Sequence, residues 1–131
     1  MKAGRVQIEV IALNIEFLTL VKRIQVDFKE FNKVQETINA DEFSCEKLPE
    51  VNHPGIKELE TKSLRIVQIL ERAQVLVAGG ATLSETLGEA LATGVSASMQ
   101  VVAHGSLALQ EEILQLEEEC QRSRGVVPRQ E

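Results

Sequence analysis

The chain has 131 residues, of which 44% are apolar and 26% are charged, and this composition is typical of one folded domain. Its net charge is −6, and residues 66–131 hold four basic side chains against nine acidic ones. This acidity excludes a nucleic acid as the main partner, because phosphate binding requires an excess of lysine and arginine. An acidic surface fits plain solvation or a basic protein partner.

The first predicted helix covers about residues 5–38. Apolar residues recur there at spacings of three and four, which places them on one side of a helix. Its one gap of seven holds Val34 or Gln35. The stripe consists of Val10, Leu13, Phe17, Val21, Ile24, Phe28, Phe31 and Ile38.

The first half of this helix is apolar on more than one side. Outside the main stripe lie Ile8, Ile11, Ile15, Leu18 and Leu20. We therefore expect this half to be contacted by several helices or by a second subunit. The alternation of Val6, Ile8 and Val10 would also suit a strand, but no turn follows that could pair it.

Residues 39–55 read as a connection, because they contain the turn and breaker residues Asn39, Pro49, Asn52, Pro54 and Gly55. A short helix around residues 41–48 fits inside this connection. It would place Phe43 and Leu48 against the core.

The second predicted helix starts at Pro54 or Gly55 and runs to about Ala78, since proline is tolerated in the first helical turn. Gly79 and Gly80 end it, because glycine adopts the left-handed conformation at low cost. Thr82 and Glu85 then form a T-x-x-E capping box. Together these signals predict a tight antiparallel helical hairpin. The apolar stripe of this helix consists of Ile56, Leu59, Ile66, Leu70, Ala73 and Val77.

The third predicted helix covers residues 83–122, either as one continuous helix or with a break near Gly105, and we favour continuity. Small residues recur every four positions along it, which allows another backbone to approach closely. The uncharged stretch 90–110 is too polar for a lipid-facing span. Residues 1–124 form one helical domain, and residues 125–131 are predicted to be a disordered tail because Pro128 blocks a helix.

No catalytic, cofactor-binding or metal-binding residue is predicted. His53 and His104 lack converging ligands, so His53 is expected to cap a helix and His104 to occupy a polar position on one. Cys45 and Cys120 have acidic neighbours, which disfavour a reactive thiolate. They form no disulfide framework, although one bridge between them is possible in principle. The first residues do not form a signal peptide. These features favour a cytoplasmic protein with reduced thiols.

The sequence thus predicts an all-α protein, an antiparallel bundle of three long helices with a long connection between the first two. Its predicted function is that of a non-enzymatic helical protein–protein interaction module. It would self-associate, with a dimer favoured, and act as an adaptor or inhibitor of a protein partner. The predicted interface residues, which would otherwise be core, are Phe17, Val21, Ile24, Phe28, Phe31, Gly94, Ser98 and Val101.

Two other classes of function stay open. A membrane-active protein could insert apolar helices after a rearrangement, and its support is the uncharged stretch 90–110. An enzyme or small-ligand binder could use a cavity between helices. The absence of Trp, of Tyr and of clustered catalytic residues makes this last class the weakest of the three.

Overall fold

The computed structural model describes residues 2–39, 45, 49 and 53–129. Throughout these residues the regular structure is helical, with no strand, so the predicted all-α class is confirmed. The predicted count of three helices is wrong, because the third divides into two. The four helices are α1 (Lys2–Asn39), α2 (Pro54–Ala78), α3 (Glu85–Ala92) and α4 (Val95–Arg129).

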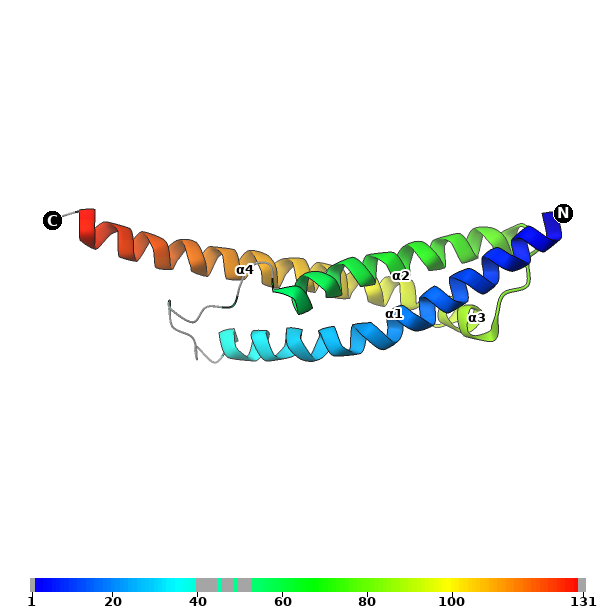
Figure 1. The fold of residues 1–131 in the computed structure, drawn as a ribbon, viewed down its shortest axis with the longest axis horizontal. Helices are drawn as coiled ribbons and strands as arrows, with labels where there is room; N and C mark the ends of the chain where they lie inside the picture. The colour runs from blue at the N-terminus through cyan, green and yellow to red at the C-terminus, as the bar shows by residue number, and fades with distance from the viewer. Residues whose placement is uncertain (1, 40–44, 46–48, 50–52, 130–131) are drawn as a thin grey trace.

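The central element is α2, which packs along both α1 and α4. It runs antiparallel to each of them, so α1 and α4 point in the same direction (Figure 1). The short helix α3 contacts the other three helices near the end of α2. The last part of α4 extends beyond the end of α1 and the start of α2, which makes the molecule elongated (Figure 1).

The break between α3 and α4 falls at Thr93 and Gly94, not near Gly105. Gly94 has a φ of +73°, a left-handed conformation that glycine adopts without the strain of a Cβ. The Thr93 hydroxyl donates to the carbonyl oxygen of Glu89 at 2.9 Å and satisfies the end of α3. Gly105 is helical within α4, where a Cβ in its place would lie 4.0 Å from Phe31 Cζ.

The connection between α2 and α3 confirms the predicted glycine stop. Gly80 has a φ of +96°, and the N–H of Ala81 donates to Leu76 O at 2.9 Å, which closes the helix in a Schellman motif. The predicted capping box is wrong, because Ser84 is the cap of α3. Its hydroxyl accepts from the N–H of Leu87 at 3.2 Å and donates to Asn14 Oδ1 at 2.7 Å. This second bond ties α3 to α1.

The core follows the predicted stripes. The larger of two clusters of buried apolar residues joins α1 to α2 and α3. Its α1 members are Val10, Leu13, Phe17 and Ile24. A second cluster joins the end of α1 to α2 and α4 through Val34, Ile38, Ile56, Leu109 and Ile113. The α2 stripe is buried as predicted except for Val77, which is 40% exposed.

Two further expectations concern the ends of the elements. The short helix predicted around residues 41–48 lies outside the described residues, apart from Cys45. The segment 125–129, predicted to be a disordered tail, is the last part of α4. Pro128 comes one residue before the end of that helix, so its missing N–H costs the helix one hydrogen bond.

Candidate interaction surfaces

Among the described residues, a second stripe on α1 forms a row of exposed large apolar side chains. Its four side chains are spaced by three, four and three residues, so at about 100° per residue they fall within an arc of roughly 80°. They lie on the side of α1 opposite the buried Leu13. We call them the outer stripe: Ile8 (68% exposed), Ile11 (51%), Ile15 (60%) and Leu18 (42%).

The apolar side chains of the outer stripe stop at a glycine at one end and at a lysine at the other. Gly4 precedes it on the same face of α1, and Lys22 follows it. Beyond Lys22 the same face continues with the exposed residues Val26, Lys29, Lys33 and Glu36. The outer face of α1 is therefore apolar in its first half and mainly basic in its second half.

Ion pairs between α1 and α2 accompany the orientation in which α1 buries its core stripe and turns the outer stripe outward. Arg65 donates two hydrogen bonds to the Glu16 carboxylate, at 2.6 and 2.7 Å. Arg72 likewise donates two hydrogen bonds to the carboxylate of Glu9, which lies two helical turns before Glu16 on α1. Because Glu9 and Glu16 flank the outer stripe, rotating its side chains toward α2 would break both pairs.

These contacts also shift the pKa values of the groups involved. The hydrogen bond from Arg65 lowers the pKa of Glu16, and the hydrogen bond from Arg72 lowers the pKa of Glu9. Burial alone would lower the pKa of Lys62, but its hydrogen bonds to Asp27 and Glu58 outweigh this and raise the pKa. Lys62 Nζ lies 2.7 Å from Asp27 Oδ2, so this pair is a third ionic contact between α1 and α2.

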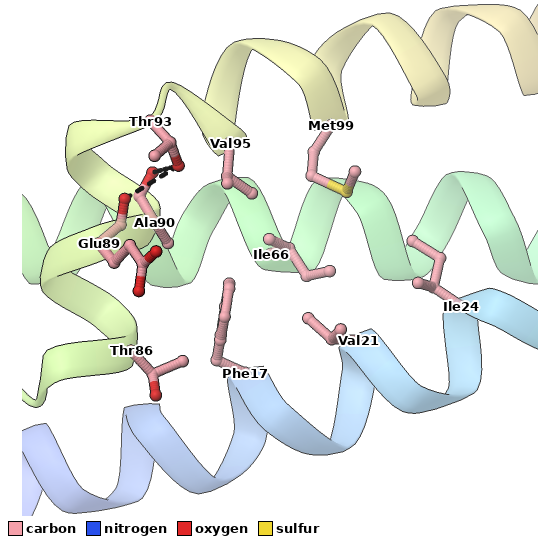
Figure 2. Close-up of a pocket in the computed structure, with 10 residues that line it drawn as sticks. All are labelled: Phe17, Val21, Ile24, Ile66, Thr86, Glu89, Ala90, Thr93, Val95 and Met99. Atoms are coloured by element: carbon pink, nitrogen blue, oxygen red, sulfur yellow. Dashed lines mark hydrogen bonds between the residues drawn. The ribbon is translucent and has the colours of Figure 1, made fainter.

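A second candidate surface is an apolar groove of about 360 Å³ between α1, α3 and α4. In Figure 2, Ile66 of α2 lies between side chains of α1 below and α4 above. The α3 residues at one end add the polar groups, including the carboxylate of Glu89. The lining residues are Phe17, Val21, Ile24, Ile66, Thr86, Glu89, Ala90, Thr93, Val95 and Met99.

The structure separates the predicted interface residues into two groups. On α1, Phe17 and Ile24 are each 5% exposed and belong to the core, while Val21, Phe28 and Phe31 pack against that core partly buried. On α4, Ser98 and Val101 are exposed, and Gly94 forms the break before that helix. Phe17, Val21 and Ile24 line the groove, whereas Val101 is 70% exposed and is not among its lining residues.

Of the predicted α1 interface residues, the chain itself buries Phe17 and Ile24. The outer stripe, which stays exposed, was recognisable in the sequence as apolar residues outside the main stripe. Its spacing of three and four residues was the signal. What the sequence lacked was the information on which of the two stripes packs against α2.

Cys45 and Cys120 form a disulfide across 75 residues of sequence, with their Cα atoms 5.5 Å apart. The expectation of reduced thiols is therefore wrong for this structure. Because α1 and α4 point in the same direction, the end of α1 and the second half of α4 lie toward the same end of the molecule (Figure 1). The bridge joins Cys45, six residues after α1, to α4.

In the described part of the chain, neither histidine belongs to a group of residues that could hold a metal ion. His53 caps α2 as predicted, because its Nδ1 accepts from the N–H of Gly55 at 3.2 Å. His104 is exposed on α4. Within the described part of the chain, no three His, Cys, Asp or Glu residues lie close enough to hold a metal ion. Among the same residues, no helix combines the length and the apolar character needed to cross a membrane.

Comparison with known proteins leaves the function to be argued from the structure. No protein-family model matches the sequence, and neither a curated protein nor a solved structure gives a significant match.

Proposed function

We propose that the protein is a non-enzymatic helical interaction module that self-associates through the outer stripe of α1. The observation that carries this proposal is the exposure of four large apolar side chains in one continuous row. Together they expose roughly 400 Å² of apolar surface, a size common for the largest patch on a single chain, and such patches are often functional. Leaving this area in water is unfavourable, so its burial would drive association.

The size of the stripe sets the expected strength of association. Two copies would bury roughly 800 Å² through these side chains, which is below the roughly 1,200 Å² of stable specific interfaces, so the residues around the stripe must supply the rest of a weak interface. We therefore expect a reversible dimer with a dissociation constant of about 1–100 μM, rather than an obligate one. A closed dimer with two-fold symmetry uses the same surface on both copies, which suits a single stripe.

Molar mass measured by analytical ultracentrifugation over a concentration series tests the proposal. We expect the wild type to change from monomer to dimer, and Ile11→Ser with Ile15→Ser to stay monomeric. The matched control is Leu64→Ser with Val75→Ser, which changes two α2 residues that are 44% and 57% exposed. A monomeric wild type at the highest concentration, or a stripe variant that still dimerises, would refute the proposal.

The role of adaptor or inhibitor toward a basic protein is the more specific form of this proposal. It is supported by the exposed acidic residues on the second half of α4, which are Glu111, Glu112, Glu118 and Glu119. Their charge would favour a basic partner surface. Replacing all four by Gln should weaken binding of any such partner while leaving dimerisation through α1 unchanged.

The membrane-active alternative requires a separate test, co-sedimentation with liposomes. Liposomes of neutral and of anionic lipid are both needed, because Lys22, Lys29 and Lys33 lie on the outer face of α1. Self-association in water without binding to either lipid would favour the interaction module. Binding to liposomes that the Ile11→Ser and Ile15→Ser changes abolish would favour the membrane.

The cytoplasmic location stays a prediction, and it conflicts with a formed disulfide. Disulfides are rare in cytosolic proteins because glutathione and thioredoxin keep thiols reduced. Alkylation of the protein directly in lysed cells, followed by mass spectrometry, decides the matter. Blocked Cys45 and Cys120 would support a reducing compartment, and an intact bridge would indicate an oxidising one.

A further inference from the structure

We propose that two copies of this chain pair antiparallel along the outer stripe of α1, with Ile8 opposite Leu18 and Ile11 opposite Ile15 of the second copy. This inference rests on the proposed self-association and adds its geometry. The two-fold axis would pass α1 at the level of residue 13, halfway along the stripe. The occupant of the exposed face is thus a second copy of the same face.

The position of the stripe permits this arrangement. Leu13, which is 8% exposed, faces the interior of its own chain, while the stripe residues on either side of it face outward. The paired copies would therefore meet back to back, with the cores on the outer sides of the two α1 helices. The Glu9–Arg72 and Glu16–Arg65 pairs would not need to open.

The length of the stripe fixes the register. From Ile8 to Leu18 the helix rises about 15 Å. A shift of one turn in either direction would leave an isoleucine or leucine of each copy exposed. Full burial of all four side chains on both copies requires the stripes to coincide from end to end.

The charges that follow the outer stripe along α1 favour an antiparallel over a parallel pair of α1 helices. Lys22, Lys29 and Lys33 lie on the same face of α1 as the stripe and are exposed. A parallel pair in register would place each lysine beside its own copy. The like-charge contacts of Lys22 and Lys29 would oppose association, whereas the charge of Lys33 is offset by Glu30 at 3.8 Å. An antiparallel pair places Lys22 opposite Gly4, where no side chain intervenes, and carries Lys29 and Lys33 past the end of the partner helix.

Site-directed crosslinking outside the stripe tests the geometry without altering the stripe. Both native cysteines are in the disulfide, so an added cysteine provides the free thiol. Lys22→Cys is mixed with Gly4→Cys carrying a size tag, and a short bismaleimide crosslinker is added. A Cβ at Gly4 meets no atom within 4 Å, so the substitution fits.

In the antiparallel dimer the mixed Lys22→Cys and Gly4→Cys pair should crosslink at least about tenfold faster than either variant alone. In that arrangement two copies of Lys22 are separated by about 27 Å along the helix axis, too far for a short linker. The control mixture of Leu64→Cys with tagged Val75→Cys, on α2, should crosslink only at the background rate.

Each other outcome overturns a defined part of the argument. Rapid crosslinking of Lys22→Cys with itself, in a sample that ultracentrifugation shows to be dimeric, would establish a parallel pair and refute this inference alone. A dimer without crosslinks from either α1 position would refute the inference and place the interface on another face. A wild type that stays monomeric would refute the proposed self-association together with its geometry.

Discussion

Arg65 of α2 holds Glu16 of α1 through two hydrogen bonds of 2.6 and 2.7 Å, and this contact forms only in the rotation of α1 that buries Phe17 in the core. Glu16 lies directly after Ile15, which is 60% exposed, and directly before Phe17, which is 5% exposed. The pair thus separates the side of α1 that forms the core from the side that presents the outer stripe. It links the fold to the proposed function.

Acid should weaken this attachment. The pKa values of Glu16 and Glu9 are lowered in the folded chain, so their contribution to stability is present above the unfolded value near 4.5. It is lost as the pH falls through the lower folded pKa values. We expect Glu9→Gln with Glu16→Gln to be less stable than the wild type at pH 7 and nearly equal to it at pH 2.5, in urea unfolding followed by circular dichroism.

The expected difference at pH 7 is small, because Glu16 and Arg65 are 40% and 43% exposed and water screens their attraction. An exposed pair of this kind contributes up to about 1 kcal/mol. Glu111→Gln with Glu118→Gln is the control, since these exposed α4 carboxylates are in no ion pair among the described residues. A difference between wild type and Glu9→Gln with Glu16→Gln that persists unchanged at pH 2.5 would contradict the explanation.

Two buried serines should respond in opposite ways to replacement by alanine. Ser63 and Ser106 are both 0% exposed, but Ser106 donates to the carbonyl oxygen of Ile56 at 2.5 Å, whereas Ser63 Oγ has no hydrogen-bond partner among the described residues. Ser106→Ala should cost about 1 kcal/mol. Ser63→Ala should be neutral or stabilise by about 0.5–1 kcal/mol, since it removes an unsatisfied hydroxyl and raises helix propensity.

Chemical denaturation of both variants under the same conditions is sufficient, because each serves as the control for the other. Both positions lie in helices and are equally buried, so loss of volume and change of propensity are matched. Equal destabilisation of the two variants would mean that Ser63 is satisfied in solution.

Replacing two glycines of the chain by alanine should also change stability in opposite directions. Gly94 has a φ of +73°, so an alanine there is strained by about 1–2 kcal/mol. Gly105 is helical, and an added Cβ would lie 4.0 Å from Phe31 Cζ, an ordinary contact. Gly105→Ala should therefore stabilise by up to about 1 kcal/mol. Thermal unfolding would show a lower midpoint for Gly94→Ala and a higher one for Gly105→Ala; the reverse order would place the helix break at Gly105.

The two glycines also show how far the sequence could predict the fold. Periodicity gave the helices and their buried faces, because burial repeats every 3.6 residues and does so in the sequence as well. Both glycines interrupt the third predicted helix at a similar cost in propensity, so local preference could not decide between them. The choice of Gly94 depends on α3 docking through Ser84 to Asn14 of α1, a contact across 70 residues.

The candidate site was also predictable only in part. The sequence revealed two apolar stripes on the first helix, Leu13 representing one and Ile11 the other. Which stripe stays exposed depends on how α1 packs against distant residues, such as Leu70 in the shared core and Arg65, which pairs with Glu16 across 49 residues. Periodicity alone contains no information about such distant partners, so the interface was assigned to the stripe that became the core.

The disulfide between Cys45 and Cys120 should make stability depend on redox conditions. It closes a loop of 75 residues, for which chain entropy alone predicts about 4 kcal/mol of stabilisation, and measured values are usually lower. We expect the free energy of unfolding to fall by about 2–4 kcal/mol on reduction. Urea unfolding with and without a phosphine reductant measures it.

Cys45→Ser with Cys120→Ser provides the control, because this variant should match the reduced wild type and be insensitive to the reductant. Neither cysteine belongs to the outer stripe or to the ion pairs between α1 and α2, so dimerisation at low urea should survive reduction. If reduction left stability unchanged, the bridge would not constrain the unfolded chain in solution. If reduction abolished the dimer while the monomer stayed folded, the interface would involve the bridged end of α4 rather than the first half of α1.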